Sequence, residues 1–62
     1  MSMENVFQKK YEEKGYKNRL DYLINIANDY GVPFDVVRGM AFVLGAEEDF
    51  DGLIAALEDW ED

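Results

Sequence analysis

The chain lacks the side chains that most enzymes use for covalent catalysis and metal binding. Its 62 residues include no cysteine, no histidine and no threonine, and the one serine, Ser2, stands next to the N-terminus. Disulfides, the common zinc ligand sets and nucleophilic triads are therefore excluded. Carboxylates are plentiful, but acid–base catalysis needs one of them in an apolar pocket, for which so short a chain has little room. We predict that the protein is not an enzyme and binds no cofactor.

Long hydrophobic runs are also missing. No stretch of the chain approaches the about 20 apolar residues of a membrane-spanning helix. The N-terminus does not show the basic segment followed by an apolar run that marks a secretory signal. We therefore expect a cytoplasmic protein that makes no contact with a membrane.

Basic side chains are scarce in the second half of the chain. Residues 1–31 carry five basic and five acidic side chains, whereas residues 32–62 carry nine acidic side chains and one basic side chain, Arg38. All of the net charge of −8 therefore lies in the second half. A negative field of this kind repels DNA phosphates and anionic membranes and attracts basic protein surfaces. The charge thus favours a protein partner, for example one that itself binds nucleic acid, over nucleic acid.

Proline occurs once, and the glycines are few but regularly placed. Gly15, Gly31 and Gly45 each follow a helix-like run and precede an apolar residue, a pattern typical of a helix end. Pro33 suits the first position of a helix. The spacing predicts four helices, at residues 3–14, 18–30, 33–44 and 51–60, with an acidic connector at 45–50. Because no alternating strand pattern occurs, we predict an all-α fold, a compact bundle of about four short helices that forms one domain over residues 1–62.

Apolar periodicity predicts which side chains of these helices face the core. The predicted inward residues are Val6, Phe7 and Tyr11 in the first helix, Leu20, Leu23, Ile24, Ala27 and Tyr30 in the second, and Leu53, Ile54, Leu57 and Trp60 in the fourth. Asn18, answered by Asp21, is the predicted N-cap of the second helix, and Asp51 is the predicted N-cap of the fourth.

Residues 23–44, LINIANDYGVPFDVVRGMAFVL, resemble a helix-turn-helix unit. Ala27 occupies the close-packing position, Gly31 the turn, and Val37 and Met40 the core positions. The resemblance implies a dimeric transcriptional regulator that binds DNA. The face that would enter the major groove contains only one basic side chain, and it comprises Pro33, Phe34, Asp35, Arg38, Gly39 and Phe42. We therefore expect no direct binding to nucleic acid, and the regulator remains an alternative function.

The segment EEDFDGLIAALE, residues 47–58, resembles the calcium loop of the EF-hand family. The resemblance implies the calcium ligands Glu47, Asp49, Asp51 and Glu58. The sequence departs from the family pattern in opening with a glutamate, and in placing Phe50 and Ala55 where small or oxygen-bearing side chains are usual. Alternatively, Asp49 and Asp51 charge the N-terminus of the last helix, where the helix dipole favours carboxylates. This interpretation predicts little response to calcium, and a calcium-binding module remains a second alternative.

The third predicted helix is apolar on all sides. Its apolar residues are Phe34, Val36, Val37, Met40, Ala41, Phe42, Val43 and Leu44. Such a helix is either central in a core or half of an interface, and both interpretations fit the pattern. If the helix forms an interface, Phe34 and Phe42 are the predicted anchors, with Arg38 beside them, because aromatic side chains dominate binding energies.

Two segments, DYGVPFDVVRGMAFVLG and EEDFDGLIAALEDWED, resemble parts of short acidic proteins from Gram-positive phages and mobile elements. The resemblance implies an accessory or inhibitory protein that acts on a host protein. In one form of this hypothesis the protein mimics DNA and presents carboxylates to a nucleic-acid-binding protein; these are Glu47, Glu48, Asp49, Asp51, Glu58, Asp59, Glu61 and Asp62. Alternatively, the carboxylates only keep the protein soluble. The sequence thus predicts an acidic protein-interaction module, with a homodimer as a further possibility.

Overall fold

Helices account for all the regular structure of the described chain. The computed structural model describes the backbone of residues 4–60 and the side chains of residues 8–60. Its elements are α1 (Glu4–Glu13), α2 (Arg19–Tyr30), α3 (Phe34–Leu44), the 3-10 helix η1 (Ala46–Glu48) and α4 (Gly52–Glu58). The all-α prediction is therefore confirmed, and each helix begins and ends within two residues of its predicted bounds. None of these helices is long and apolar enough to span a membrane.

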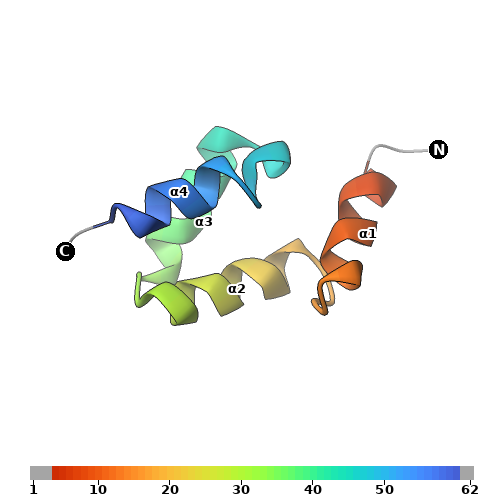
Figure 1. Ribbon diagram of the computed structural model, residues 1–62, viewed down its shortest axis with the longest axis horizontal. Coiled ribbons are helices and arrows are strands. Elements are labelled where there is room, and N and C mark those ends of the chain that lie inside the picture. Colours follow the sequence, from red (N-terminus) through yellow and green to blue (C-terminus); the bar gives the residue numbers. More distant parts are fainter. Residues whose placement is uncertain (1–3, 61–62) are drawn as a thin grey trace.

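The helices are arranged around the junction of α2 and α3. In Figure 1, α2 runs along the long axis of the molecule, α3 turns back from its end, and α4 lies in front of α3. The first helix, α1, stands at the opposite end and packs against α2. The molecule measures 40 × 21 × 17 Å along its principal axes. It is therefore elongated, with α1 at one end and α3 and α4 at the other.

Glycine ends α2 and creates the tight turn of the predicted helical hairpin. Gly31 has a φ of 67° and a ψ of 30°, a left-handed conformation that costs glycine little and other residues more. Its N–H donates to the carbonyls of Ala27 and Asn28, and the Val32 N–H donates to the Ala27 carbonyl at 3.0 Å. These bonds direct the chain back along α2 and bury Val32.

Side chains cap two of the helices. Asn18 caps α2 as predicted, because its Oδ1 accepts the Asp21 N–H at 2.9 Å. The fourth helix differs from the prediction. Asp51 is at its N-cap position, but the Asp51 side chain makes no capping hydrogen bond. Glu48 takes that role, since its Oε1 accepts the Gly52 N–H at 3.2 Å.

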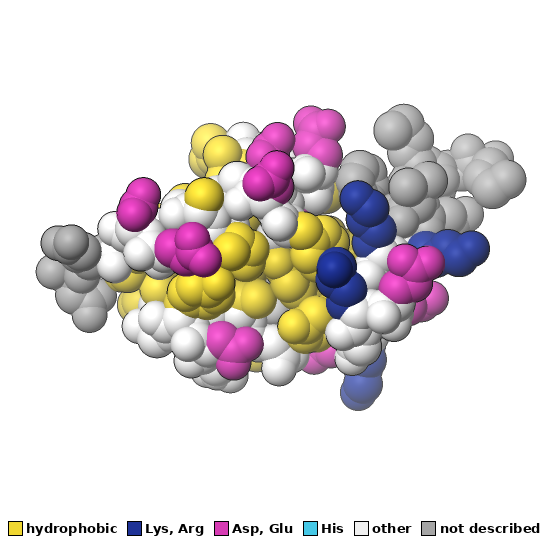
Figure 2. Space-filling model, in the orientation of Figure 1, with side chains coloured by type: hydrophobic (Ala, Val, Ile, Leu, Met, Phe, Trp, Pro, Cys, Tyr) yellow, Lys and Arg dark blue, Asp and Glu magenta, His cyan; other side chains and the backbone are white. Residues whose placement is uncertain are grey.

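The core is built from side chains of all four α-helices and the turn after α2. The buried hydrophobic residues are Tyr11, Tyr22, Leu23, Ile26, Ala27, Val32, Val37, Ala41, Leu53 and Leu57. Those predicted inward and found buried are Tyr11, Leu23, Ala27, Leu53 and Leu57. The side chains of Val6 and Phe7 lie outside the described residues. Hydrophobic atoms also reach the surface between α2 and α4 in Figure 2.

The prediction was wrong for one face of α2 and for the end of the chain. Leu20 and Ile24 are 56% and 43% exposed, and Tyr30 is also exposed. In their place Tyr22 faces inward, because its ring packs among other aromatic rings and its hydroxyl donates to a buried carbonyl. After α4, Trp60 is 36% exposed, while Ile54 packs against the core as a half-buried side chain.

Candidate functional site

A fully buried carboxylate joins three helices. The side chain of Asp49, in the turn before α4, is 0% exposed. Arg19 donates two hydrogen bonds to this carboxylate, from Nε to Oδ2 at 2.7 Å and from Nη2 to Oδ1 at 2.9 Å. The Tyr11 hydroxyl donates to the same Oδ2 at 2.5 Å, and Arg19 Nη2 also donates to the Ala41 carbonyl at 2.9 Å. Asp49 and Arg19 thereby connect α1, α2 and α3.

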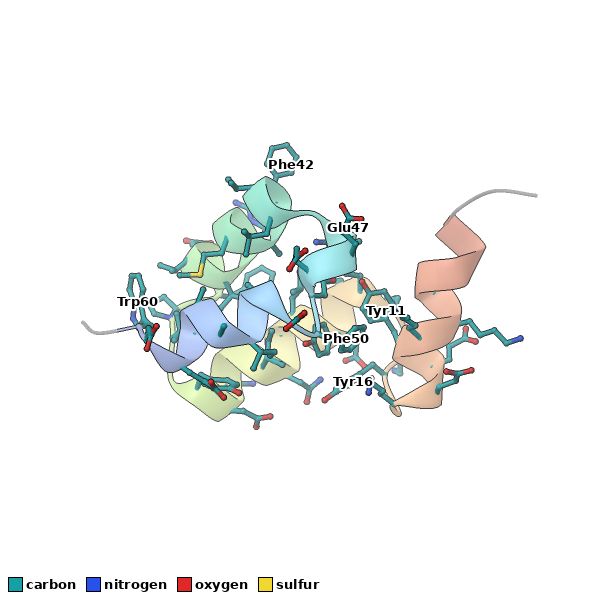
Figure 3. All side chains as sticks on the ribbon, turned by 45° about the horizontal axis from the view of Figure 1, so that its top comes forward. Tyr11, Tyr16, Phe42, Glu47, Phe50 and Trp60 are labelled. Carbon is teal, nitrogen blue, oxygen red and sulfur yellow. The ribbon has the colours of Figure 1, made fainter. Side chains whose placement is uncertain are left out.

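Aromatic rings surround this carboxylate. Tyr22 donates from its hydroxyl to the Asp49 carbonyl at 2.5 Å, and its ring centroid lies 4.7 Å from that of Phe50 and 5.1 Å from that of Tyr16. Figure 3 shows Tyr11, Tyr16 and Phe50 converging where α1 meets the rest of the molecule. Burial raises the pKa of both Tyr11 and Tyr22, and the hydrogen bond to Asp49 adds to the effect for Tyr11. We call these four rings, with Asp49 and Arg19, the aromatic junction.

The aromatic junction is a structural joint. No buried side-chain nitrogen or oxygen in the described part of the chain lacks a hydrogen-bond partner. A ligand therefore finds no unpaired polar group there to bind. The junction holds α1 against the remainder of the molecule through Tyr11.

Asp49 contradicts two predictions. It was expected to present its carboxylate to a partner and, in the alternative function, to ligate calcium. Both are wrong for this residue, because Arg19 and Tyr11 occupy its two oxygens. Across residues 8–60, whose side chains are described, no three acidic side chains gather in a way that could hold a metal ion. Glu47, Asp51 and Glu58 are therefore not brought together as a metal-binding group in the described part of the chain.

Arg19 was not predicted from the sequence to be the partner of Asp49. One signal was present, because Arg19 is the only arginine among the basic residues of the first half, and the others are lysines. Arginine presents a planar fork of donors that suits a carboxylate in a two-pronged contact, which lysine cannot make. The pairing itself links positions 30 residues apart, and no local pattern indicates it.

The second half of α3 exposes large apolar side chains. Phe42 is 85% exposed and Val43 is 82% exposed, and Phe42 points away from the body of the molecule in Figure 3. Beside them are two shallow hollows, one lined by Arg38, Gly39 and Phe42 and the other by Gly39, Met40, Val43, Leu44 and Ala56. We define the α3 surface as Gly39, Met40, Phe42, Val43, Leu44 and Ala56. Grouped apolar exposure of this kind marks interaction sites more often than single exposed residues do.

The opposite side of α3 belongs to the core. Val37 and Ala41 are buried, and Phe34 and Val36 are half-buried against the core cluster. Met40 lies at the border, because it packs against the core cluster and also lines the second hollow. The core interpretation is therefore confirmed for this side of the helix, and the interface interpretation stays a prediction for the exposed side. Of the two predicted anchors, Phe42 is free to meet a partner, whereas Phe34 is held partly inside the fold. Arg38 is exposed at the edge of the first hollow.

Exposed carboxylates follow the α3 surface along the chain. Glu47 on η1, Asp51 before α4, and Glu58 and Asp59 at the end of α4 are all exposed, and Glu48 is half-buried where it caps α4. Glu61 and Asp62 lie outside the described residues. On the face shown in Figure 2, Lys and Arg side chains gather at the α1 end, together with some Asp and Glu side chains, whereas the charged side chains over the remainder are Asp and Glu. The apolar α3 surface therefore lies within the acidic part of the molecule.

Comparison with protein families, with curated proteins and with solved structures finds no match to this chain.

Proposed function

We propose that this protein is a small acidic protein-interaction module that binds its partner through the α3 surface. The observation that carries the proposal is the exposure of Phe42 and Val43, 85% and 82%, side by side on one helix. Fully burying one such side chain is worth about 1.5–3 kcal/mol. A partner that covers both therefore gains binding free energy from a small contact.

The carboxylates define the kind of partner. Residues 39–60 contain six acidic side chains and no basic one, and of the six only Asp49 is neutralised by an ion pair within the described residues. A basic protein surface complements this charge. In the form of the proposal that mimics DNA, Glu47, Asp51, Glu58 and Asp59 meet the basic groove of a nucleic-acid-binding protein. This form agrees with the accessory or inhibitory role that the resemblance to phage proteins implies.

We do not propose a DNA-binding regulator or a calcium module. The hairpin of α2 and α3 covers the residues that resemble a helix-turn-helix unit, but α3 carries one basic side chain, Arg38, and one acidic side chain, Asp35. DNA affinity depends mostly on neutralising phosphates, which this helix cannot do. A calcium loop would need the Asp49 carboxylate that Arg19 already holds.

Capture from an extract of the cells that naturally produce the protein tests the proposal. Tagged wild-type protein, Phe42→Ser and Leu20→Ser are compared by quantitative mass spectrometry of the bound proteins. Leu20 is a matched control because it is 56% exposed and lies on α2, outside the α3 surface. We expect a protein that binds the wild type and Leu20→Ser and is lost with Phe42→Ser. Identical captured proteins from all three would contradict the proposal.

A further inference from the structure

Gly39 has no structural reason, within the described molecule, to be glycine. It lies in the middle of α3, and its φ is not positive. A Cβ atom built on it meets nothing within 4 Å. Glycine inside a helix is less stable than alanine, because it loses more backbone freedom on folding. An unfavourable residue facing open space indicates that something outside the molecule approaches there.

Gly39 also lines both of the hollows beside α3. One hollow lies between Gly39 and Phe42, and the other between Gly39, Val43 and Ala56 of α4. Phe42 and Val43 are three and four residues beyond Gly39, so they stand on the same side of α3, one turn further along. The result is a notch bordered by large apolar side chains. A notch of this kind lets a second helix approach α3 closely, with its side chains packed between the ridges.

The charge around the notch selects what can enter it. Asp35 is exposed one turn before Gly39, on the same side of α3. Glu47 follows α3, and Asp59 directly follows α4, three residues after Ala56; both are exposed. Arg38 lines the first hollow and is the only basic side chain of α3, so the exposed carboxylates outnumber it in the segments next to the notch. Lysine or arginine side chains flanking an entering helix meet opposite charges.

We infer that the α3 surface binds an amphipathic α-helix of another protein, whose apolar stripe crosses α3 at Gly39 and whose flanking side chains are lysine or arginine. The inference rests on the proposed function and names the chemistry of its partner. A second copy of this chain is a poorer occupant, because it brings its own carboxylates to the contact and like charges oppose association.

Designed helical peptides test the partner chemistry. The first has a leucine stripe and a lysine polar face, the second has the same stripe and a glutamate polar face, and the third has the composition of the first in scrambled order. Binding is measured by fluorescence polarisation with labelled peptide at physiological salt. We expect the first peptide to bind about tenfold or more tightly than either of the others.

Variants of the α3 surface test its location. Phe42→Ser is expected to weaken binding of the lysine-faced peptide by about tenfold or more, as loss of an anchor does. Gly39→Ala is expected to raise the midpoint of thermal unfolding and yet weaken peptide binding, because the added methyl group fills the notch. A purely structural role of Gly39 does not produce these opposite changes. Leu20→Ser, on α2, leaves binding unchanged.

Three results would overturn the inference. The first is equal binding of the scrambled peptide, which shows charge attraction alone. The second is unchanged binding by Phe42→Ser or Gly39→Ala. The third is a dimer, detected by sedimentation, that the Phe42→Ser substitution dissociates. In that case a second copy of this chain occupies the α3 surface. If none of the peptides binds while capture of a protein from the extract still depends on Phe42, the inference is wrong and the proposed function stands. If capture does not depend on Phe42, the proposed function itself is wrong.

Discussion

Asp49 is the shared acceptor of the aromatic junction, because Arg19 and Tyr11 both donate to its carboxylate. We expect Asp49→Ala to lower the free energy of unfolding by about 3 kcal/mol, since it leaves the Arg19 charge and the Tyr11 hydroxyl without their acceptor. Urea denaturation followed by circular dichroism measures the loss. Asp49→Asn keeps the shape and one acceptor oxygen and should lose less. An alanine variant as stable as the wild type would contradict the assigned role.

The tyrosines of the aromatic junction make the fold sensitive to alkali. Burial holds the pKa of Tyr11 and Tyr22 above the ordinary tyrosine value of 10.0. The native state therefore keeps its phenolic protons at a pH where the unfolded chain releases them. The resulting stability is fully present below pH 10.0 and is lost as the pH rises above that value.

Thermal unfolding at increasing alkaline pH checks this expectation, with tyrosinate absorbance recorded in parallel. The double variant Tyr11→Phe, Tyr22→Phe is the control, and its unfolding midpoint should depend less on alkaline pH. The expectation fails if tyrosine absorbance changes fully near the ordinary pKa while the helices remain folded.

Two glycines, Gly39 in the middle of α3 and Gly31 at the end of α2, should respond in opposite ways to replacement by alanine. We expect Gly39→Ala to stabilise the protein by about 0.5–1 kcal/mol, because alanine favours the helix and its Cβ meets open space. Gly31→Ala, just before α3, should destabilise by about 1–2 kcal/mol, since Gly31 has a positive φ of 67°. Differential scanning calorimetry of the two variants gives shifts of opposite sign. A loss of stability in Gly39→Ala would show that α3 needs glycine for its own packing.

The two phenylalanines of α3 should respond differently to truncation. Phe42→Ala is expected to change stability by less than about 0.5 kcal/mol, because its ring is 85% exposed. Phe34→Ala removes a ring that packs against the core and should cost about 1–3 kcal/mol. Circular dichroism and thermal unfolding distinguish these outcomes. If Phe42→Ala melts the helices, the α3 surface is core, and any partner must bind the acidic residues instead.

Local signals predict where helices begin and end but not which face they bury. The stops at Gly31 and Gly45 and the cap at Asn18 are short-range features, and the structure confirms all three. The buried face of α2 was predicted only in part, because apolar side chains lie on more than one side of this helix. Tertiary contacts decide between these sides, and the hydrogen bond from Tyr22 to the Asp49 carbonyl is one of them.

In the candidate site, too, short-range signals predict some features, while others depend on tertiary contacts. Phe42 was predicted as an anchor from the apolar excess of its helix, and its exposure keeps that role open. The burial of Asp49 could not be predicted, because a carboxylate in an acidic segment is usually solvated. Only its distant partner Arg19 makes the burial favourable, and that pairing depends on the whole fold.

At the scale of the whole molecule, the charge predicts no affinity for DNA. The net charge is −8, and no basic side chain follows Arg38. We expect no measurable binding to random or promoter DNA at physiological salt, because there is too little positive charge to neutralise phosphates. Fluorescence polarisation with a labelled duplex measures it. Affinity in the micromolar range or tighter would restore the helix-turn-helix regulator as the function.

The ion pair between Arg19 and Asp49 has a further consequence for how the molecule opens. Its groups belong to α2 and to the turn before α4, and they also bind Tyr11 of α1 and the Ala41 carbonyl of α3. If α1 unfolds locally, the buried Asp49 carboxylate loses the Tyr11 hydroxyl as a donor. If α4 moves away, the Asp49 carboxylate becomes exposed. The helices are therefore coupled, and local opening of one should raise the opening of the others. Native-state hydrogen exchange should show the central amides of α1, α2 and α3 opening together as one cooperative unit.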